Sequence, residues 1–300
     1  MFSIARTGIW VAILPSLLVL SGRCCAQNAP ATVEIGMPNS LFQGVPQFLR
    51  NAGAKPFLKL MKDATGIGGN INFEPDAMTL AGHVQTGKIQ LGVFQGHEFA
   101  WAKQKYPNLV PIAVAKPMQP VQAYCIVRYN CSAKDLGDMD KKTIILPSLH
   151  RDYCDLFLMK EKQKHMQGKA FSAQITAKNS ADAIFDVIDE KADCTIVDTA
   201  SLHFFKTVHP GAFGNVKILC QSEIFPNACI AVKKDDLPPQ VLEKFQSALL
   251  RAQDLPGGMP MLATWKLDGF VRVPDDYENQ LKNVLKLYPA PPVARAAVDK

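Results

Sequence analysis

The chain has 300 residues, of which 48% are hydrophobic and 20% charged, and its formal net charge is +6. This composition is ordinary for a globular protein and excludes a disordered or low-complexity chain. The basic excess is mild and lacks the clustered Lys/Arg stripe of a nucleic-acid-binding protein. We therefore exclude nucleic acid as a partner and retain a small anionic solute.

The N-terminus has the pattern of a secretory signal peptide. A short stretch containing Arg6 leads into an apolar run from Ile9 to Leu20. This run has about a dozen residues, fewer than the roughly 20 that a membrane-spanning helix needs, so an uncleaved anchor is the less favoured alternative. We predict a signal peptide over residues 1–26 and a periplasmic mature chain, whose net charge is +4 once the two arginines of the signal are removed.

The cysteines raise three alternatives. A lipid anchor at Cys24 or Cys25 is disfavoured because Arg23 stands where a lipoprotein signal has a small residue. In an oxidising compartment, the even number of remaining cysteines predicts disulfides, with fifteen pairings open, or else buried thiols. There is no C-x-x-C and no tightly spaced Cys/His pair, so we expect neither a metal site nor a cofactor. The six remaining cysteines are Cys125, Cys131, Cys154, Cys194, Cys220 and Cys229.

Strand-like and helix-like segments alternate from residue 32 onward, which is typical of parallel α/β architecture. Gly66 and Gly87 mark the ends of the first two helices, since glycine readily takes the left-handed conformation that ends a helix. The predicted elements of this part are the strands Thr32–Gly36, Ile71–Phe73 and Ile89–Phe94 and the helices Phe57–Thr65 and Met78–Thr86.

A proline-bracketed segment, Lys116–Pro120, predicts a crossover to a second lobe. We expect lobe 1 over residues 27–120, lobe 2 over 121–228, and a return to lobe 1 over 229–300, so that two crossings make a hinge. The predicted elements here are the extended segments Val121–Tyr129, Thr143–Leu146, Cys194–Val197, Val216–Cys220 and Cys229–Val232 and the helices Asp152–Gln167, Ala181–Asp189, Gln240–Ala252 and Tyr277–Leu287.

Several segments resemble the periplasmic substrate-binding proteins of phosphate, phosphite and phosphonate ABC transporters, over about residues 33–288. The resemblance rests on their order and spacing. The most specific are DAMTLAGHVQTGKIQLGVFQG (Asp76–Gly96), ADCTIVDTASL (Ala192–Leu202), IFPNACIAV (Ile224–Val232) and the segment Gly257–Phe270.

The resemblance implies a type II periplasmic-binding fold of two lobes that close about a hinge over a small, oxyanionic solute. It also implies a non-enzymatic role, with an ABC transporter permease as the partner of an otherwise monomeric protein. The chain departs from the family at Ala77, where a tyrosine often faces the ligand, at the turn Pro147–Arg151, which keeps only one hydroxyl, and at Asn179-Ser180.

The loop between the strand Thr143–Leu146 and the following helix is a candidate anion site. Backbone N–H groups at a helix start bind anions, and Ser148, His150 and Arg151 can add a hydroxyl, a titratable donor and a guanidinium. The alternative is that His150 and Arg151 are solvated residues of an exposed loop.

Gln95, Gly96 and His97 follow the strand Ile89–Phe94, at the end where open α/β sheets place ligands. Gln95 and His97 can hydrogen-bond a solute, and Gly96 allows its backbone to approach closely. Glu98 is better explained as a helix-start residue that complements the dipole.

Asp198 follows the strand Cys194–Val197 and can accept hydrogen bonds from a protonated phosphonate, an amine or a hydroxyl, or else cap the next helix. Asn39, in the loop after the first strand, is a candidate by position alone.

The sequence has no G-x-S-x-G or H-E-x-x-H, so an enzyme using Cys154 or His150 is disfavoured. An orphan ligand sensor that signals to a membrane receptor is the main alternative function.

Overall fold

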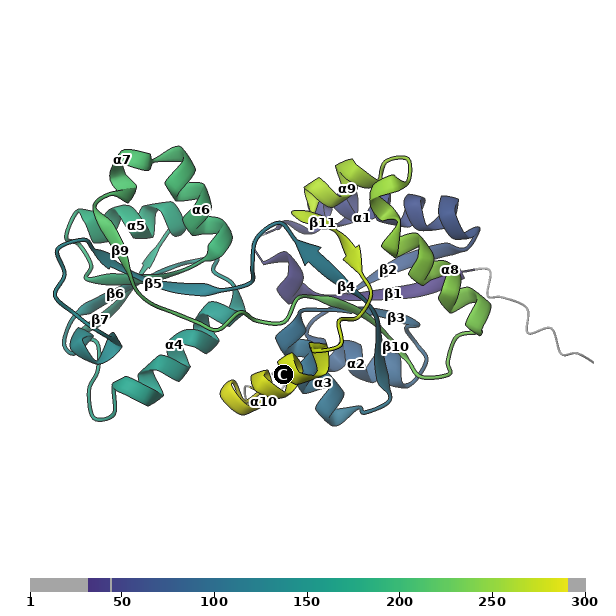
Figure 1. The fold of residues 1–300 in the computed structure, drawn as a ribbon, viewed down its shortest axis with the longest axis horizontal. Coiled ribbons are helices and arrows are strands. Elements are labelled where there is room, and N and C mark those ends of the chain that lie inside the picture. Colours follow the sequence, from purple (N-terminus) through teal and green to yellow (C-terminus); the bar gives the residue numbers. More distant parts are fainter. Residues whose placement is uncertain (1–31, 44, 291–300) are drawn as a thin grey trace, which may run out of the picture.

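The computed structural model describes residues 32–43 and 45–290, which form two α/β lobes (Figure 1). The predicted two-lobed fold is confirmed by this arrangement of two sheets with flanking helices. The predicted signal peptide, with Cys24 and Cys25, lies outside the described residues. No helix among the described residues is both long enough and apolar enough to cross a membrane.

Lobe 1 is built on a six-stranded sheet with the order β11-β4-β10-β3-β1-β2. Strands β1, β2 and β3 are parallel, whereas β10 runs antiparallel to β3 and β4, and β11 antiparallel to β4. The strands are β1 (Thr32–Pro38), β2 (Gly68–Glu74), β3 (Leu91–Phe94), β4 (Leu109–Pro117), β10 (Cys229–Lys233) and β11 (Leu267–Val271).

Helices cover both faces of this sheet. One face packs against α1 (Gln47–Thr65), α8 (Pro239–Leu250) and α9 (Gly258–Thr264). The other face packs against α2 (Ala77–Gln85), α3 (Gly96–Lys105) and α10 (Tyr277–Leu287). The short 3₁₀ turns η1 (Asn39–Phe42) and η3 (Ala252–Asp254) complete the lobe.

Lobe 2 is built on a five-stranded sheet with the order β7-β6-β8-β5-β9. Strands β6, β7 and β8 are parallel, and β5 is antiparallel to both of its neighbours. The elements are β5 (Ala123–Arg128), η2 (Leu136–Met139), β6 (Thr143–Pro147), α4 (Asp152–His165), β7 (Ala173–Ala177), α5 (Ser180–Ile188), β8 (Cys194–Asp198), α6 (Thr199–Val208), α7 (Pro210–Phe213) and β9 (Val216–Gln221).

Two chain segments cross between the lobes side by side, one between β4 and β5 and the other between β9 and β10 (Figure 1). They are hydrogen-bonded to each other. Ser222 N donates to Ala123 O at 2.9 Å, and Phe225 N donates to Val121 O at 2.8 Å. These bonds join the two crossings into one hinge.

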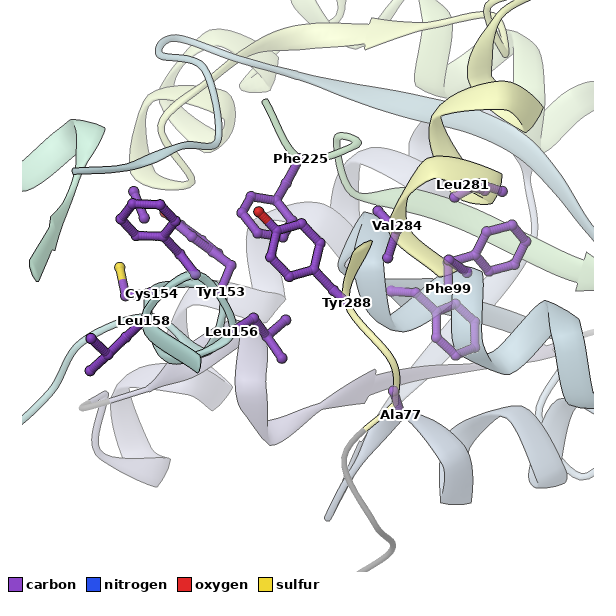
Figure 2. Close-up of a cluster of buried hydrophobic side chains, with 14 of the residues drawn as sticks. Ala77, Phe99, Tyr153, Cys154, Leu156, Leu158, Phe225, Leu281, Val284 and Tyr288 are labelled. Atoms are coloured by element: carbon purple, nitrogen blue, oxygen red, sulfur yellow. The ribbon is translucent and has the colours of Figure 1, made fainter. Parts of the chain in front are cut away.

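A single buried apolar cluster runs from the α2, α3 and α10 side of lobe 1 to the α4 side of lobe 2. Phe225, in the returning crossing, lies between Tyr153 of α4 and Tyr288 just after α10 (Figure 2). Because apolar burial is the dominant stabilising term, this cluster favours contact between the lobes in the arrangement seen here.

Local sequence explains several helix ends. Asp76 caps α2, accepting hydrogen bonds from Met78 N and Thr79 N at 2.8 Å each. Gly66 ends α1 at a φ of 73°, in the left-handed region. However, α1 begins at Gln47, ten residues before the predicted Phe57, because tertiary packing tolerates Pro56 inside the helix.

The expected disulfides are wrong. All six cysteines in the described part of the chain are free. An even count does not require the thiols to be paired. Cys229 is in the lobe 1 sheet and Cys154 is on α4 of lobe 2, whereas Cys125 of β5 lies opposite Cys220 of β9 and both are free thiols. Burial raises the pKa of Cys229 to about 12 and that of Cys154 well above its usual range. These two side chains therefore serve as small apolar core residues.

Candidate ligand site between the lobes

The candidate site forms where elements that follow the carboxyl ends of β1 and β3 in lobe 1 meet the start of α4 in lobe 2. Two hydrogen bonds join the lobes at this point. Gln43 Nε2 donates to the carboxylate of Asp152, and the Arg151 guanidinium donates to Leu41 O at 3.4 Å. The loop after β1 therefore touches the helix start that follows β6.

His97 lies at the start of α3 and is only 1% exposed. Its ring makes edge-on contacts with Trp101, Tyr153 and Phe225, at centroid distances of 5.4, 6.3 and 5.8 Å. Burial lowers the pKa of His97 to about 3, so the ring is neutral at physiological pH. A neutral imidazole donates from one nitrogen and accepts at the other.

Glu98 is the second buried titratable residue of this helix start. The pKa of its carboxyl is raised to about 7, mainly by burial; nearby Asp152 and Asp76 add to the rise, whereas Ser40 and the Gln95 backbone oppose it. Gln95 N donates to Glu98 Oε2 at a long 3.4 Å. The side chain thus closes the first turn of α3, and it holds a proton over part of the neutral range.

Four buried polar atoms of this region have no hydrogen-bond partner among the described residues. They are Ser40 Oγ, Gln43 Oε1, Gln95 Nε2 and His97 Nε2. A buried polar atom left unpaired costs about 1–3 kcal/mol, so such atoms are rare unless a ligand or water occupies the site. Together they offer donors and acceptors to a polar solute.

The loop before α4 places its three predicted residues differently. Ser148 Oγ donates to Lys178 O at 2.8 Å, within lobe 2. The ring nitrogens of His150 lie 2.6 Å from Pro147 O and 2.7 Å from Asp155 Oδ1, and the bond to Asp155 raises the pKa of His150. Arg151 alone of the three reaches lobe 1.

The other predicted residues have structural partners. Asp198 caps α6, accepting from Ser201 N at 2.7 Å, and Asn39 Oδ1 accepts from the Arg50 guanidinium at 2.6 Å. At Gly96, an added Cβ would lie 2.1 Å from Pro226 O. The backbone that approaches Gly96 in this structure is therefore the hinge segment between β9 and β10, which contains Pro226.

Sequence reasoning missed Ser40, Gln43 and Asp152, because their positions become significant only when the lobes meet. The acidic first turn of α4, with Asp152 and Asp155, was the feature of the sequence that could have pointed to Asp152.

Within the described ranges, no group of three or more His, Cys, Asp or Glu side chains could hold a metal ion. A hollow of about 580 Å³ lies elsewhere, beside Arg128, Lys142 and Asp193 at the far end of the lobe 2 sheet.

We predict that His97 and Glu98 make opposite contributions to the pH dependence of stability. The pKa of His97 falls from 6.5 to about 3 on folding, so this residue makes folding more favourable as pH rises between those values. The pKa of Glu98 rises from 4.5 to about 7, so this residue makes folding less favourable as pH rises through that window. Where the windows overlap, the two contributions offset each other.

Urea unfolding between about pH 5 and 6 tests this. The slope of the free energy of unfolding against pH should be more positive in Glu98→Gln than in wild type, and more negative in His97→Gln. Each slope should change by up to about 1.4 kcal/mol per pH unit. Wild-type slopes in both variants would contradict the burial of these two groups.

Residues 50–277 match the family model described as the ABC transporter, phosphonate, periplasmic substrate-binding protein. None of the curated proteins compared with the chain matches it.

Several solved structures have a similar fold. XAC2383 from Xanthomonas citri, bound to ATP, has a TM-score of 0.63 at 15% identity, with 85% of this chain and 96% of that chain covered. PhnD1 from Prochlorococcus marinus, in complex with methylphosphonate, has a TM-score of 0.60 at 12% identity, covering 86% and 98%. A binding protein component of an ABC phosphonate transporter from Pseudomonas aeruginosa has a TM-score of 0.58 at 14% identity, with 84% of this chain and 85% of that chain covered.

Proposed function

This chain belongs to the family of periplasmic substrate-binding proteins of phosphonate ABC transporters, and we propose that it binds a small oxyanionic solute of the phosphate, phosphite or phosphonate type between its lobes. Its family consists of solute-binding proteins that work with an ABC transporter permease. The proposal includes export through a cleaved signal over residues 1–26 and delivery of the solute by a monomer.

The observation that carries the proposal is the set of unpaired buried polar atoms at the lobe boundary. Ser40 and Gln43 come from the loop after β1, and Gln95 and His97 from the start of α3. A bound oxyanion would accept from Gln95 Nε2 and from one tautomer of His97. The solute thereby offsets the cost of burying these groups without partners.

Lobe 2 supplies the positive charge in this proposal. Arg151 already reaches across to Leu41 O, and a guanidinium binds carboxylate or phosphoryl oxygens in a bidentate manner. The proposed site also includes five residues that lie at or just after the carboxyl end of a strand and would line the space around the solute: Asn39, Gly96, Ser148, His150 and Asp198. Acidic Glu98 and Asp152 favour a solute that carries a protonated oxygen over a fully ionised one.

Calorimetric titration and thermal denaturation of the mature protein test the proposal. Methylphosphonate, phosphate, phosphite and small carboxylates are the probes. A solute present at 100 times its Kd should stabilise the protein by about 2.7 kcal/mol. If no anion at millimolar concentration shifts the midpoint or produces heat, the proposal is wrong.

Two variants locate the site, and two matched variants control for surface effects. Gln95→Ala and Arg151→Met should each weaken binding by about tenfold or more, because each removes a hydrogen-bonding group from a buried contact with an anion. The exposed residues Gln240 and Arg251 of lobe 1 provide the controls Gln240→Ala and Arg251→Met, which should bind like wild type. Equal affinities in all four variants would place the solute elsewhere.

A further inference from the structure

Tyr288, the residue that follows α10, is fixed to lobe 1 by its backbone. Its carbonyl oxygen accepts from Trp101 Nε1 of α3 at 2.9 Å, and its N–H donates to Val284 O at 2.7 Å. The residue is only 3% exposed. Tyr288 also lies beyond residues 50–277, the part of the chain that matches the family.

The side chain of Tyr288 reaches the hinge and lobe 2. Its hydroxyl donates to Glu223 Oε2 in the returning crossing, and Lys160 of α4 donates to Glu223 Oε1. Lys160 Nζ also lies 3.5 Å from the Tyr288 hydroxyl and 5.3 Å from the centre of its ring. One residue from each of lobe 1, the hinge and lobe 2 thus forms a connected polar group.

The charges of this group favour the contact. Burial alone would raise the pKa of Glu223, but the hydrogen bonds from Lys160 and Tyr288 outweigh it and lower that pKa below its ordinary value. Glu223 is therefore ionised at neutral pH, opposite a cation. Hydrogen bonds to ionised groups are about twice as strong as those between neutral groups.

An aromatic stack runs beside the polar group. The Phe225 ring lies 4.8 Å from Tyr288 and 5.4 Å from Tyr153, between centroids (Figure 2). Tyr153 stands at the start of α4, next to Arg151 and Asp152 of the candidate site. Since α4 is one continuous helix, contacts at Lys160 and at Tyr153 constrain the same element.

We propose that Lys160, Glu223 and Tyr288 form a C-terminal latch that holds α4 against lobe 1 in the arrangement seen here. To open the lobes, α4 has to leave Tyr288 and the Phe225 ring. The latch residues act as positioning residues, because they reach the solute site only through α4. A segment outside the family's matched residues thereby sets how readily the lobes separate.

Distances between two spin labels test the latch without any solute, so the result does not depend on the proposed function. Exposed Glu243 on α8 and Thr207 on α6 are suitable positions, one on each lobe. The labels are attached through unnatural amino acids, since the native thiols would react with cysteine reagents. Wild type should give one narrow distance distribution.

Tyr288→Phe and Lys160→Met should each reduce the ratio of the latched to the open population by about fivefold or more, within the usual range of coupling between sites. Tyr288→Phe retains the ring and removes only the hydroxyl. Tyr129→Phe, at an exposed tyrosine, and Lys164→Met, at an exposed lysine of the same helix, are the matched controls and should leave the distribution unchanged.

A charge-swapped pair separates the latch from a general loss of stability. Lys160→Glu alone should open the lobes, and the double variant Lys160→Glu/Glu223→Lys should restore the wild-type distribution. Distributions that match wild type in Tyr288→Phe and Lys160→Met would overturn the proposal. So would a double variant that stays as open as Lys160→Glu.

Discussion

Phe225→Ala is expected to lower the free energy of unfolding by about 3–5 kcal/mol, the usual cost of removing a buried phenylalanine ring. The side chain is 2% exposed and packs against Tyr153, Tyr288 and His97. At this chain length, each kcal/mol shifts Tm by about 2–4 °C. Urea unfolding and calorimetry of the mature protein measure the effect.

Phe204→Ala is the matched control, because Phe204 lies on α6 with 61% of its surface exposed. This change should alter stability by no more than about 0.5 kcal/mol. Equal losses in the two variants would show that Phe225 does not support contact between the lobes. A broader unfolding transition in Phe225→Ala alone would indicate that the lobes then unfold separately.

Gly96→Ala should cost about 1–3 kcal/mol or more, because the new methyl group meets backbone that cannot rotate away. An added Cβ would lie 2.1 Å from Pro226 O and 2.7 Å from Asn227 O, well inside van der Waals contact. The returning hinge segment has to move away from α3. We therefore expect both a lower midpoint in urea and a changed distance between labels on the two lobes.

Gly53→Ala provides the comparison. Gly53 lies inside α1, and an added Cβ there meets no atom of the described residues within 4 Å. Because glycine destabilises a helix interior, this substitution should stabilise the protein by about 0.5–1 kcal/mol. If Gly96→Ala were as well tolerated as Gly53→Ala, the close approach of the hinge would be wrong.

Local patterns predicted many elements well. The segments Thr32–Gly36 and Cys194–Val197 correctly predicted β1 and β8, and glycine stops marked the ends of α1 and α2 near their observed positions. Patterns failed where local and tertiary preferences disagree. The first ten residues of α1 were not predicted, and Pro56 lies inside that helix although proline disfavours a helix interior. The exposed strand β7 has no alternation of burial that its sequence could show.

The candidate site was only partly predictable for the same reason. The residues at strand ends, such as Gln95, His97 and Arg151, follow from the rule that parallel strands direct their carboxyl ends to one edge. Whether a side chain there is free or already paired depends on its neighbours in space. Asp198 and Asn39 are paired within their own lobes, whereas Gln95 Nε2 has no partner among the described residues.

The sequence by itself determined that the chain alternates strands and helices in two sets, crosses twice between them, and resembles phosphonate-binding proteins. These features depend on residue patterns within short segments. The tertiary structure decided which groups face each other across the lobes: Gln43 with Asp152, His97 with Tyr153, and Tyr288 with Glu223 and Lys160. Such pairs are separated by tens of residues or more, and only the packing of α3, α4 and the hinge brings them together.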